Sequence, residues 1–175
     1  AGKTTLFNVM TGLQRPDSGH VLLGGIDVSK AATHKRARLG LARTFQRLEV
    51  FGSLTVLDNV RAAAEIRHGR AGQLDMAEAA LRRVGIEHLA GIPAHRLPTG
   101  QARLLELARA LVTQPRVLLL DEPASGLSHE ESLELAVVIR SVAAEGVAAV
   151  LVEHDVDLVM RLCSTVHVLD FGDVI

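Results

Sequence analysis

The chain has 175 residues, which is enough for one domain with a sizeable core and too few for two ordinary domains. Hydrophobic residues make up 48% of it, which excludes a disordered chain, and no apolar run approaches the roughly 18 residues of a membrane-spanning helix. A net charge of −1 argues against a protein that mainly neutralises nucleic-acid phosphates, so no nucleic-acid partner is expected. The single cysteine, Cys163, excludes an intrachain disulfide.

The first half of the chain is divided into short elements by turn residues. We predict a helix over residues 4–11 that ends at Gly12, a strand over 20–23, and a strand over 41–45 that leads into Gln46. The next part, residues 55–85, is predicted to be helical. Thr55 and Asp58 have approximate capping-box spacing for a first helix, and apolar residues at helical spacing ending at Gly85 predict a second.

The second half alternates predicted strands and helices. Two apolar runs, 117–120 and 148–152, are predicted as strands buried on both faces, as in a parallel sheet. Ser128 and Glu131 form a capping box for the helix between them. Further helices are predicted over 102–112 and 155–163, with a strand over 165–169 and a turn over 170–173. This order predicts an α/β fold with right-handed crossovers.

The chain opens on a motif that binds phosphate. Gly2, Lys3 and Thr4 match the end of G-x-x-x-x-G-K-[ST], in which backbone amides and a helix N-terminus surround phosphates, lysine contacts β/γ oxygens and the hydroxyl holds Mg²⁺. Since the first half of that motif is missing and no Met precedes it, we interpret the sequence as a piece of a longer protein. Alone, this short match is weak evidence.

Polar side chains follow the two buried strands. Asp121 and Glu122 come directly after the first strand and His154 after the second, so all three are expected at the carboxyl edge of the sheet, where ligands bind. Asp121 could hold a metal ion through water, Glu122 could polarise an attacking water, and His154 could contact a γ-phosphate. Pro123 follows the carboxylates and Ser128 caps the next helix, which disfavours a simple capping role for Asp121.

In chain order, these motifs resemble the nucleotide-binding domain of ABC transporters. The resemblance spans the whole chain and rests on Gly2–Thr5 (Walker A), Gln46 (Q-loop), 97–101 (signature), Asp121–Glu122 (Walker B) and His154 (switch histidine). It implies a P-loop NTPase-type parallel sheet flanked by helices, with a helical subdomain inserted between Q-loop and signature. On this basis residues 1–46 and 102–175 form the core and 47–101 the helical subdomain of one nucleotide-binding domain.

The resemblance also implies an ATPase with ATP and Mg²⁺ as cofactors. It makes Glu122 and His154 catalytic and assigns Mg²⁺ to Thr4, Gln46 and Asp121. Residues implied to contact nucleotide are Gly2, Lys3, Thr4, Thr5 and Gln46, and, facing the ATP of a partner subunit, Thr99, Gly100 and Gln101.

Three stretches narrow the resemblance to ATPases of branched-chain amino acid importers: 38–46, 54–60 and 152–160. This implies a peripheral protein on the cytoplasmic face of the plasma membrane, with transmembrane permease subunits, a second ATPase subunit and, indirectly, a solute-binding protein as partners. A short permease helix is expected in a groove beside Gln46, and Phe51, in an unusually apolar loop, is the predicted anchor. The transported solute and the partner ATPase are not determined by the sequence.

The chain departs from the family pattern at three places. Pro98 and Thr99 replace the signature Ser and Gly, which removes a hydroxyl contact to phosphate but leaves the helix dipole and the Gly100 amide. Ser128 stands where many members have Asp. The aromatic residue that would stack on adenine precedes Walker A and is absent from this sequence.

The sequence leaves two alternatives to an importer ATPase open. One is an ABC-type translation or regulatory factor that acts without a permease, which tandem cassettes and a charged linker would mark. The other is a catalytically impaired nucleotide-binding module, which Pro98 supports and the presence of Lys3, Asp121, Glu122 and His154 opposes.

Overall fold

A computed structural model describes residues 2–69 and 71–175; Ala1, part of the predicted phosphate motif, lies outside the described residues. The centre of the fold is a parallel sheet of three strands in the order β3 (Leu41–Arg43), β4 (Val117–Asp121) and β5 (Ala148–Val152). The predicted α/β class is therefore confirmed. Two antiparallel hairpins flank it in sequence: β1 (Leu22–Leu23) with β2 (Ile26–Asp27), and β6 (Leu169–Asp170) with β7 (Asp173–Val174).

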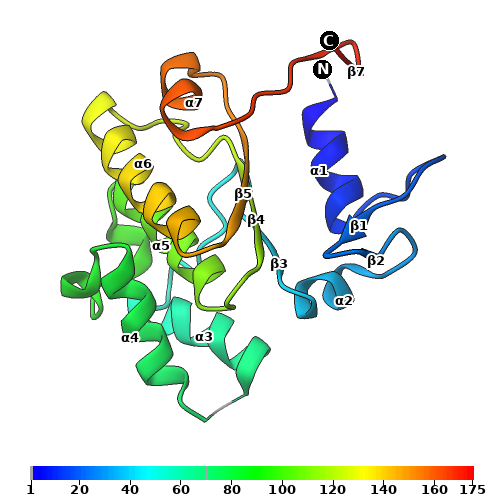
Figure 1. Ribbon diagram of the computed structural model, residues 1–175. Coiled ribbons are helices and arrows are strands. Elements are labelled where there is room, and N and C mark those ends of the chain that lie inside the picture. Colours follow the sequence, from blue (N-terminus) through cyan, green and yellow to red (C-terminus); the bar gives the residue numbers. More distant parts are fainter. Residues whose placement is uncertain (1, 70) are drawn as a thin grey trace.

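Helices cover both faces of the sheet (Figure 1). On strand β4, Leu118 and Leu120 pack into the large core shared with α5 (Thr99–Leu111) and α6 (His129–Ala144). Leu119, between them, packs on the opposite face against Phe7 of α1 (Lys3–Thr11). Because successive strand residues point to opposite faces, β4 is buried on both sides, as predicted.

The segment between β3 and β4 is helical. It contains α3 (Val56–His68), α4 (Gln73–Arg83), two short 3₁₀ turns (Glu87–Leu89 and Ala94–Arg96) and α5. Helices α3 and α4 pack against each other and against α5, and their buried side chains belong to the same core as β4 and α6. The signature helix α5 is thus the element through which the helical segment packs onto the sheet. The remaining helices are α2 (Thr33–Arg38) and α7 (Val156–Leu162).

Several predicted ends are confirmed. Helix α1 ends at Gly12, whose φ of 81° and close approach to the Arg36 guanidinium leave no room for a side chain. The capping box of Ser128 and Glu131 is present at the start of α6. Thr55 caps α3 through its hydroxyl, which accepts the amide of Asp58.

Other element predictions are wrong. The strand predicted over 165–169 is absent except for Leu169, because that strand pairs only within its own hairpin. The strand predicted over 20–23 is confined to Leu22–Leu23, β3 ends at Arg43 rather than at 45, and α5 begins at Thr99 rather than at 102. Strand β5 is not buried on both faces: of its residues only Val152 is buried, because the helices that cover β4 leave most of β5 exposed.

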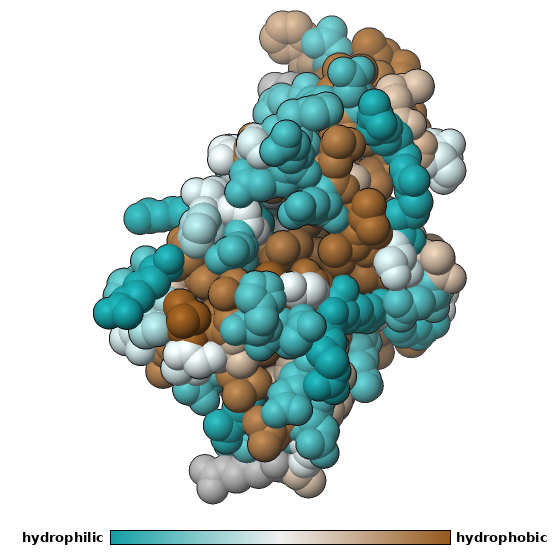
Figure 2. Space-filling model, turned by 90° about the vertical axis from the view of Figure 1, so that its left-hand side faces the viewer, coloured by the Kyte–Doolittle hydropathy of each residue, from teal (hydrophilic) through white to brown (hydrophobic). Residues whose placement is uncertain are grey.

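The surface combines charged and apolar areas. Figure 2 shows apolar side chains gathered across the middle of one face, with polar side chains around them. Among residues 2–69 and 71–175, none of the helices has both the length and the apolar character to cross a membrane.

Candidate functional site

Three residues predicted from separate motifs meet at the carboxyl edge of the sheet. Gln46 Nε2 donates a hydrogen bond to Glu122 Oε2 at 2.7 Å, and His154 Nε2 lies 2.7 Å from Glu122 Oε1. Both carboxylate oxygens of Glu122 are thus held, while the side chain keeps 17% of its surface exposed. A carboxylate fixed in this way and open to water is suited to orient or deprotonate a water molecule.

The backbone brings Glu122 and His154 together. Strands β4 and β5 pair in parallel with Asp121 opposite Val152, and the Glu122 amide donates to the Val152 carbonyl at 2.9 Å. Glu122 itself has a φ of 47°, a left-handed conformation that is rare outside glycine and turns its side chain away from the line of the strand.

Glu153 was not predicted as a site residue, yet it joins the two loops. Its carboxylate accepts the amide of Ala124 at 2.8 Å and the amide of His154 at 3.0 Å. The loop that follows β4 is therefore tied to the loop that carries His154. The sequence signal for this role was its place directly beside His154 at the end of a strand.

Asp121 lies next to this group but is deeply buried. Its carboxylate Oδ2 accepts a hydrogen bond from the Arg43 guanidinium at 2.7 Å, with the side chains 4% and 7% exposed. Arg43 also donates to Asn8 Oδ1 on α1 at 2.8 Å. Sequence reasoning missed Arg43, because nothing local to β3 indicates a partner 78 residues further along the chain.

The predicted phosphate-binding residues lie at the N-terminus of α1. Gly2 is its N-cap with a φ of 102°, Lys3 is half-buried, and Thr4 and Thr5 are exposed. The first turn contains no acidic residue, so free amides and the lysine favour an anion there. Thr4 and Asn8 are four residues apart and therefore on one face of α1, the face that Arg43 connects to Asp121.

The donor groups at this edge suit Mg²⁺. Within the described part of the chain, no three His, Cys, Asp or Glu side chains come together as a metal-binding cluster. Mg²⁺ does not need such a cluster, since it is typically held by one or two carboxylates together with phosphate oxygens and water. Thr4, Gln46 and Asp121 offer a hydroxyl, an amide oxygen and a carboxylate, and Gln46 uses only its amide nitrogen to bind Glu122.

The signature residues form the start of α5. Pro98 is the N-cap, Thr99 is exposed, Gln101 is half-buried and Gly100 is buried. A side-chain carbon at Gly100 would collide with the carboxylate of Glu131, so this position requires glycine or a shift of the α6 capping box. Because Gly100 packs within its own chain, Thr99 and Gln101 are the more accessible of the three.

The Q-loop is bound to the signature helix by buried charges. Arg103 of α5 donates to the carbonyls of Phe45 at 3.1 Å and Gln46 at 2.7 Å, and it pairs with Glu106 at 3.0 Å. Glu106 accepts the amide of Glu49, and burial raises its pKa above the usual range despite its arginine neighbours. The loop carrying Gln46 is therefore bonded directly to α5.

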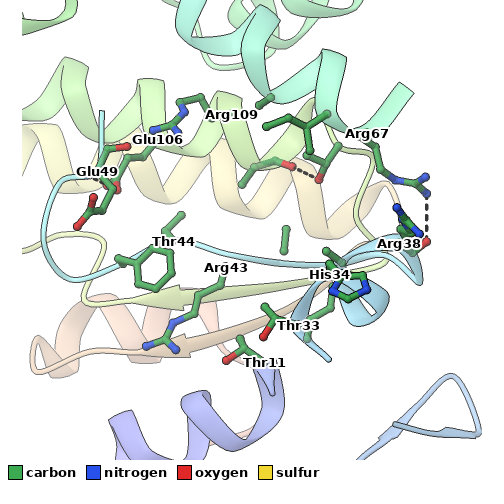
Figure 3. A pocket seen from close by; sticks show the side chains of 18 of the residues that line it. Thr11, Thr33, His34, Arg38, Arg43, Thr44, Glu49, Arg67, Glu106 and Arg109 are labelled. Atoms are coloured by element: carbon green, nitrogen blue, oxygen red, sulfur yellow. Dashed lines mark hydrogen bonds between the residues drawn. The ribbon is translucent and has the colours of Figure 1, made fainter. Parts of the chain in front are cut away.

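A pocket of about 450 Å³ lies between α1, α2 and β3 on one side and α3 and α5 on the other. Figure 3 shows His34 and Arg38 of α2 on one side of it and Arg67, Glu106 and Arg109 on the other. Beside the pocket, the Phe51 ring is 50% exposed, with the Arg109 guanidinium 4.8 Å from its centre.

A Gly-Lys-Thr motif at a helix N-terminus, with carboxylates at the end of a nearby parallel strand, defines the class of P-loop nucleotide-hydrolysing proteins. The family model described as "ABC transporter" matches residues 1–125. The LivG protein of Escherichia coli K12, a high-affinity branched-chain amino acid transport ATP-binding protein, is 35% identical over 189 residues, covering 98% of this chain and 74% of LivG. The chain belongs to the ABC transporter ATP-binding family and is an ATPase that uses ATP and Mg²⁺.

Further relatives support the same family. The lipopolysaccharide export system ATP-binding protein LptB of Acidithiobacillus ferridurans is 35% identical over 176 residues, covering 100% of this chain and 73% of LptB. The cbiO1 protein of Clostridium perfringens, part of the cbiONQ transporter complex, has a TM-score of 0.90 at 32% identity over 99% of this chain and 71% of cbiO1. The ADP conformation of the cassette MJ1267 gives 0.88 at 28% identity, covering 99% and 74% of the two chains.

Proposed function

We propose that this ATPase energises an importer of branched-chain amino acids, as a peripheral protein on the cytoplasmic face of the plasma membrane. The similarity to LivG over nearly the whole chain carries the proposal. The stretches 38–46, 54–60 and 152–160 support it because each resembles this group of importers. The proposed partners are transmembrane permease subunits, a second ATPase subunit and, through the permease, a solute-binding protein.

Lipopolysaccharide export is the second candidate. LptB is as similar as LivG, and its alignment of 176 residues has nearly the length of this chain. The alignment with LivG extends over 189 residues, more than this chain contains, so LivG has residues that are missing here. The lengths of the two alignments thus favour lipopolysaccharide export, whereas the stretches 38–46, 54–60 and 152–160 favour amino acid import.

For hydrolysis, we assign Glu122 as the carboxylate that polarises the attacking water and His154 as the group that contacts the γ-phosphate. Support comes from the hydrogen bonds that Gln46 and His154 make to the two oxygens of Glu122. Lys3 and the α1 N-terminus would bind phosphate oxygens, with Gly2, Thr4 and Thr5 beside them. Thr4, Gln46 and Asp121 would hold Mg²⁺, which neutralises phosphate charge when bound.

The signature residues are assigned to a second nucleotide. The N-terminus of α5, with Thr99 and Gln101 accessible and Gly100 behind them, would face ATP bound by the partner ATPase subunit. The permease is assigned to the pocket between α2 and α3, where a short helix would contact Phe51. This pocket borders both halves of the cassette, so its occupant would respond when they move relative to each other.

Transport in the source organism tests the proposed solute. Deleting the gene should lower the uptake of radiolabelled leucine at least severalfold, and the wild-type gene, but not Glu122→Gln, should restore it. Surface lipopolysaccharide, measured in the same strains, serves as the control. Unchanged leucine uptake together with reduced surface lipopolysaccharide would reject import and establish the second candidate.

A further inference from the structure

We propose that Arg43 is a positioning residue that neutralises Asp121 before Mg²⁺ binds and sets how strongly nucleotide binding depends on Mg²⁺. The inference rests on the proposed role of Asp121 in holding the metal ion. It concerns a residue that lies within the stretch 38–46 but to which none of the predicted motifs assigns a role. The observation that carries it is a buried ion pair formed by a carboxylate of the nucleotide site.

Arg43 is fixed in place by four groups. Its guanidinium donates to Asp121 Oδ2 at 2.7 Å and to Asn8 Oδ1 at 2.8 Å. It also lies 5.4 Å from the ring centre of Phe7 and 5.0 Å from that of Phe45, within range of cation–π attraction. Figure 3 shows the side chain extending from β3 toward α1.

These contacts join three parts of the site. Asn8 lies on α1, the helix that begins within the phosphate motif, Asp121 ends β4, and Phe45 directly precedes Gln46. In the described part of the chain, every hydrogen bond to the Asp121 carboxylate is made by Arg43 through Oδ2, so Oδ1 stays open to another cation.

Burial of the Arg43–Asp121 ion pair determines how the charge of Asp121 is balanced. A buried negative charge is unfavourable without an opposite charge beside it. The Asp121 side chain is 4% exposed, and the Arg43 guanidinium, 2.7 Å away, supplies the opposite charge in the free protein. When Mg²⁺ binds the same carboxylate, the negative charge of Asp121 is already balanced by Arg43, and the fixed positive charge of the guanidinium lies beside the metal ion. Arg43 should therefore stabilise the metal-free form and reduce what Mg²⁺ adds to nucleotide affinity.

A purely structural ion pair makes a different prediction. Loss of a structural contact would destabilise the protein with and without Mg²⁺ alike and leave the metal dependence of nucleotide affinity unchanged. The quantity that separates the two roles is the ratio of the ADP dissociation constant in EDTA to that in Mg²⁺. This ratio needs no hydrolysis.

The experiment measures this ratio by calorimetry on the intact polypeptide. Arg43→Met should raise it by roughly tenfold or more, because Mg²⁺ then becomes the only cation beside Asp121. Arg43→Gln, which keeps a hydrogen-bond donor without the charge, should do the same and replaces the first variant should that one not fold. Arg43→Lys should stay near wild type. Arg83→Met, which breaks the more exposed pair with Glu145, is the control and should not change the ratio.

Asp121→Asn separates this proposal from the assignment of the metal site. It should bring the ratio close to one whether or not Arg43 is present. An unchanged or lower ratio in both Arg43→Met and Arg43→Gln, with Asp121→Asn behaving as expected, overturns the role of Arg43 alone. A wild-type ratio in Asp121→Asn overturns the metal assignment and this proposal with it.

Discussion

Glu122 has a backbone conformation that side chains other than glycine rarely adopt, at the point where two strands deliver their polar residues. The surrounding contacts maintain it: its amide binds Val152, and its carboxylate binds Gln46 and His154. The motifs in the sequence predicted that these side chains meet. They did not predict the role of Glu153 or Arg43, because both act through partners on other segments.

The Glu106 carboxyl predicts a pH dependence of the free energy of unfolding. Burial raises its pKa, so the folded protein favours the protonated form more than the unfolded chain does. Its contribution to the free energy of unfolding is fully present below the ordinary pKa of 4.5. That contribution falls by about 1.4 kcal/mol for each pH unit above 4.5, until the pH has passed the raised pKa.

We therefore expect the wild type to lose free energy of unfolding relative to Glu106→Gln as pH rises from about 4 to 7. Urea unfolding across this range measures the difference, and Glu78→Gln, at the more exposed pair with Arg82, is the control. A difference that stays flat, or that changes in favour of the wild type, would disprove the sign of this effect.

At the level of elements, the caps of α1 and α6 and the parallel pairing of β4 with β5 were predicted, whereas several element ends, the burial of β5 and the strand at 165–169 were not. The ends of α1 and α6 were predictable because a glycine and a capping box act within a few residues. The residues of β5 were predictable, but their burial was not, since it depends on which strands and helices cover them. The strand predicted over 165–169 was wrong for the same reason: an apolar run pairs only where a partner strand lies.

Asn59 attaches the loop after Gln46 to helix α3. It is fully buried, accepts the amide of Phe51 at 2.9 Å and donates to the carbonyls of Phe51 and Thr55 at 3.0 and 2.9 Å. Asn59→Ala removes all three hydrogen bonds and leaves the Phe51 amide without a partner, whereas the two carbonyls still accept the backbone amides of Leu54 and residue 59. The substitution should cost about 1–3 kcal/mol in the free energy of unfolding.

Denaturant unfolding measures this cost. Arg61→Ala, which breaks an exposed ion pair with Asp58 on the same helix, should change the free energy of unfolding by less than about 0.5 kcal/mol. Equal effects of the two substitutions would show that Asn59 does not hold the loop.

At the scale of the whole molecule, the chain exposes 10046 Å². A compact monomer of its 18.7 kDa mass is expected to expose roughly 8,300 Å². Part of the excess is apolar: Phe51 is 50% exposed and Ile66, which lines the pocket, is 88% exposed. Surface of this kind is available for contact with partner subunits.

Phe51→Ala tests the proposed contact with the permease. It should weaken co-purification with the permease or reduce transport per ATP hydrolysed, while ATP binding by the isolated subunit persists, because Phe51 lies outside the nucleotide site. Val137→Ala, which removes an exposed apolar side chain from α6, is the matched control. Wild-type co-purification and wild-type transport in vesicles would exclude Phe51 as an anchor.

Phosphate release shows whether Glu122 is the hydrolytic carboxylate. With the permease present, Glu122→Gln should lower ATP turnover at least ~10²-fold and leave ATP binding largely intact, since the amide keeps the shape of the side chain but cannot act as a base. Glu130→Gln, exposed in the first turn of α6, should retain wild-type turnover. Comparable turnover in Glu122→Gln and wild type would show that Glu122 is not the hydrolytic carboxylate.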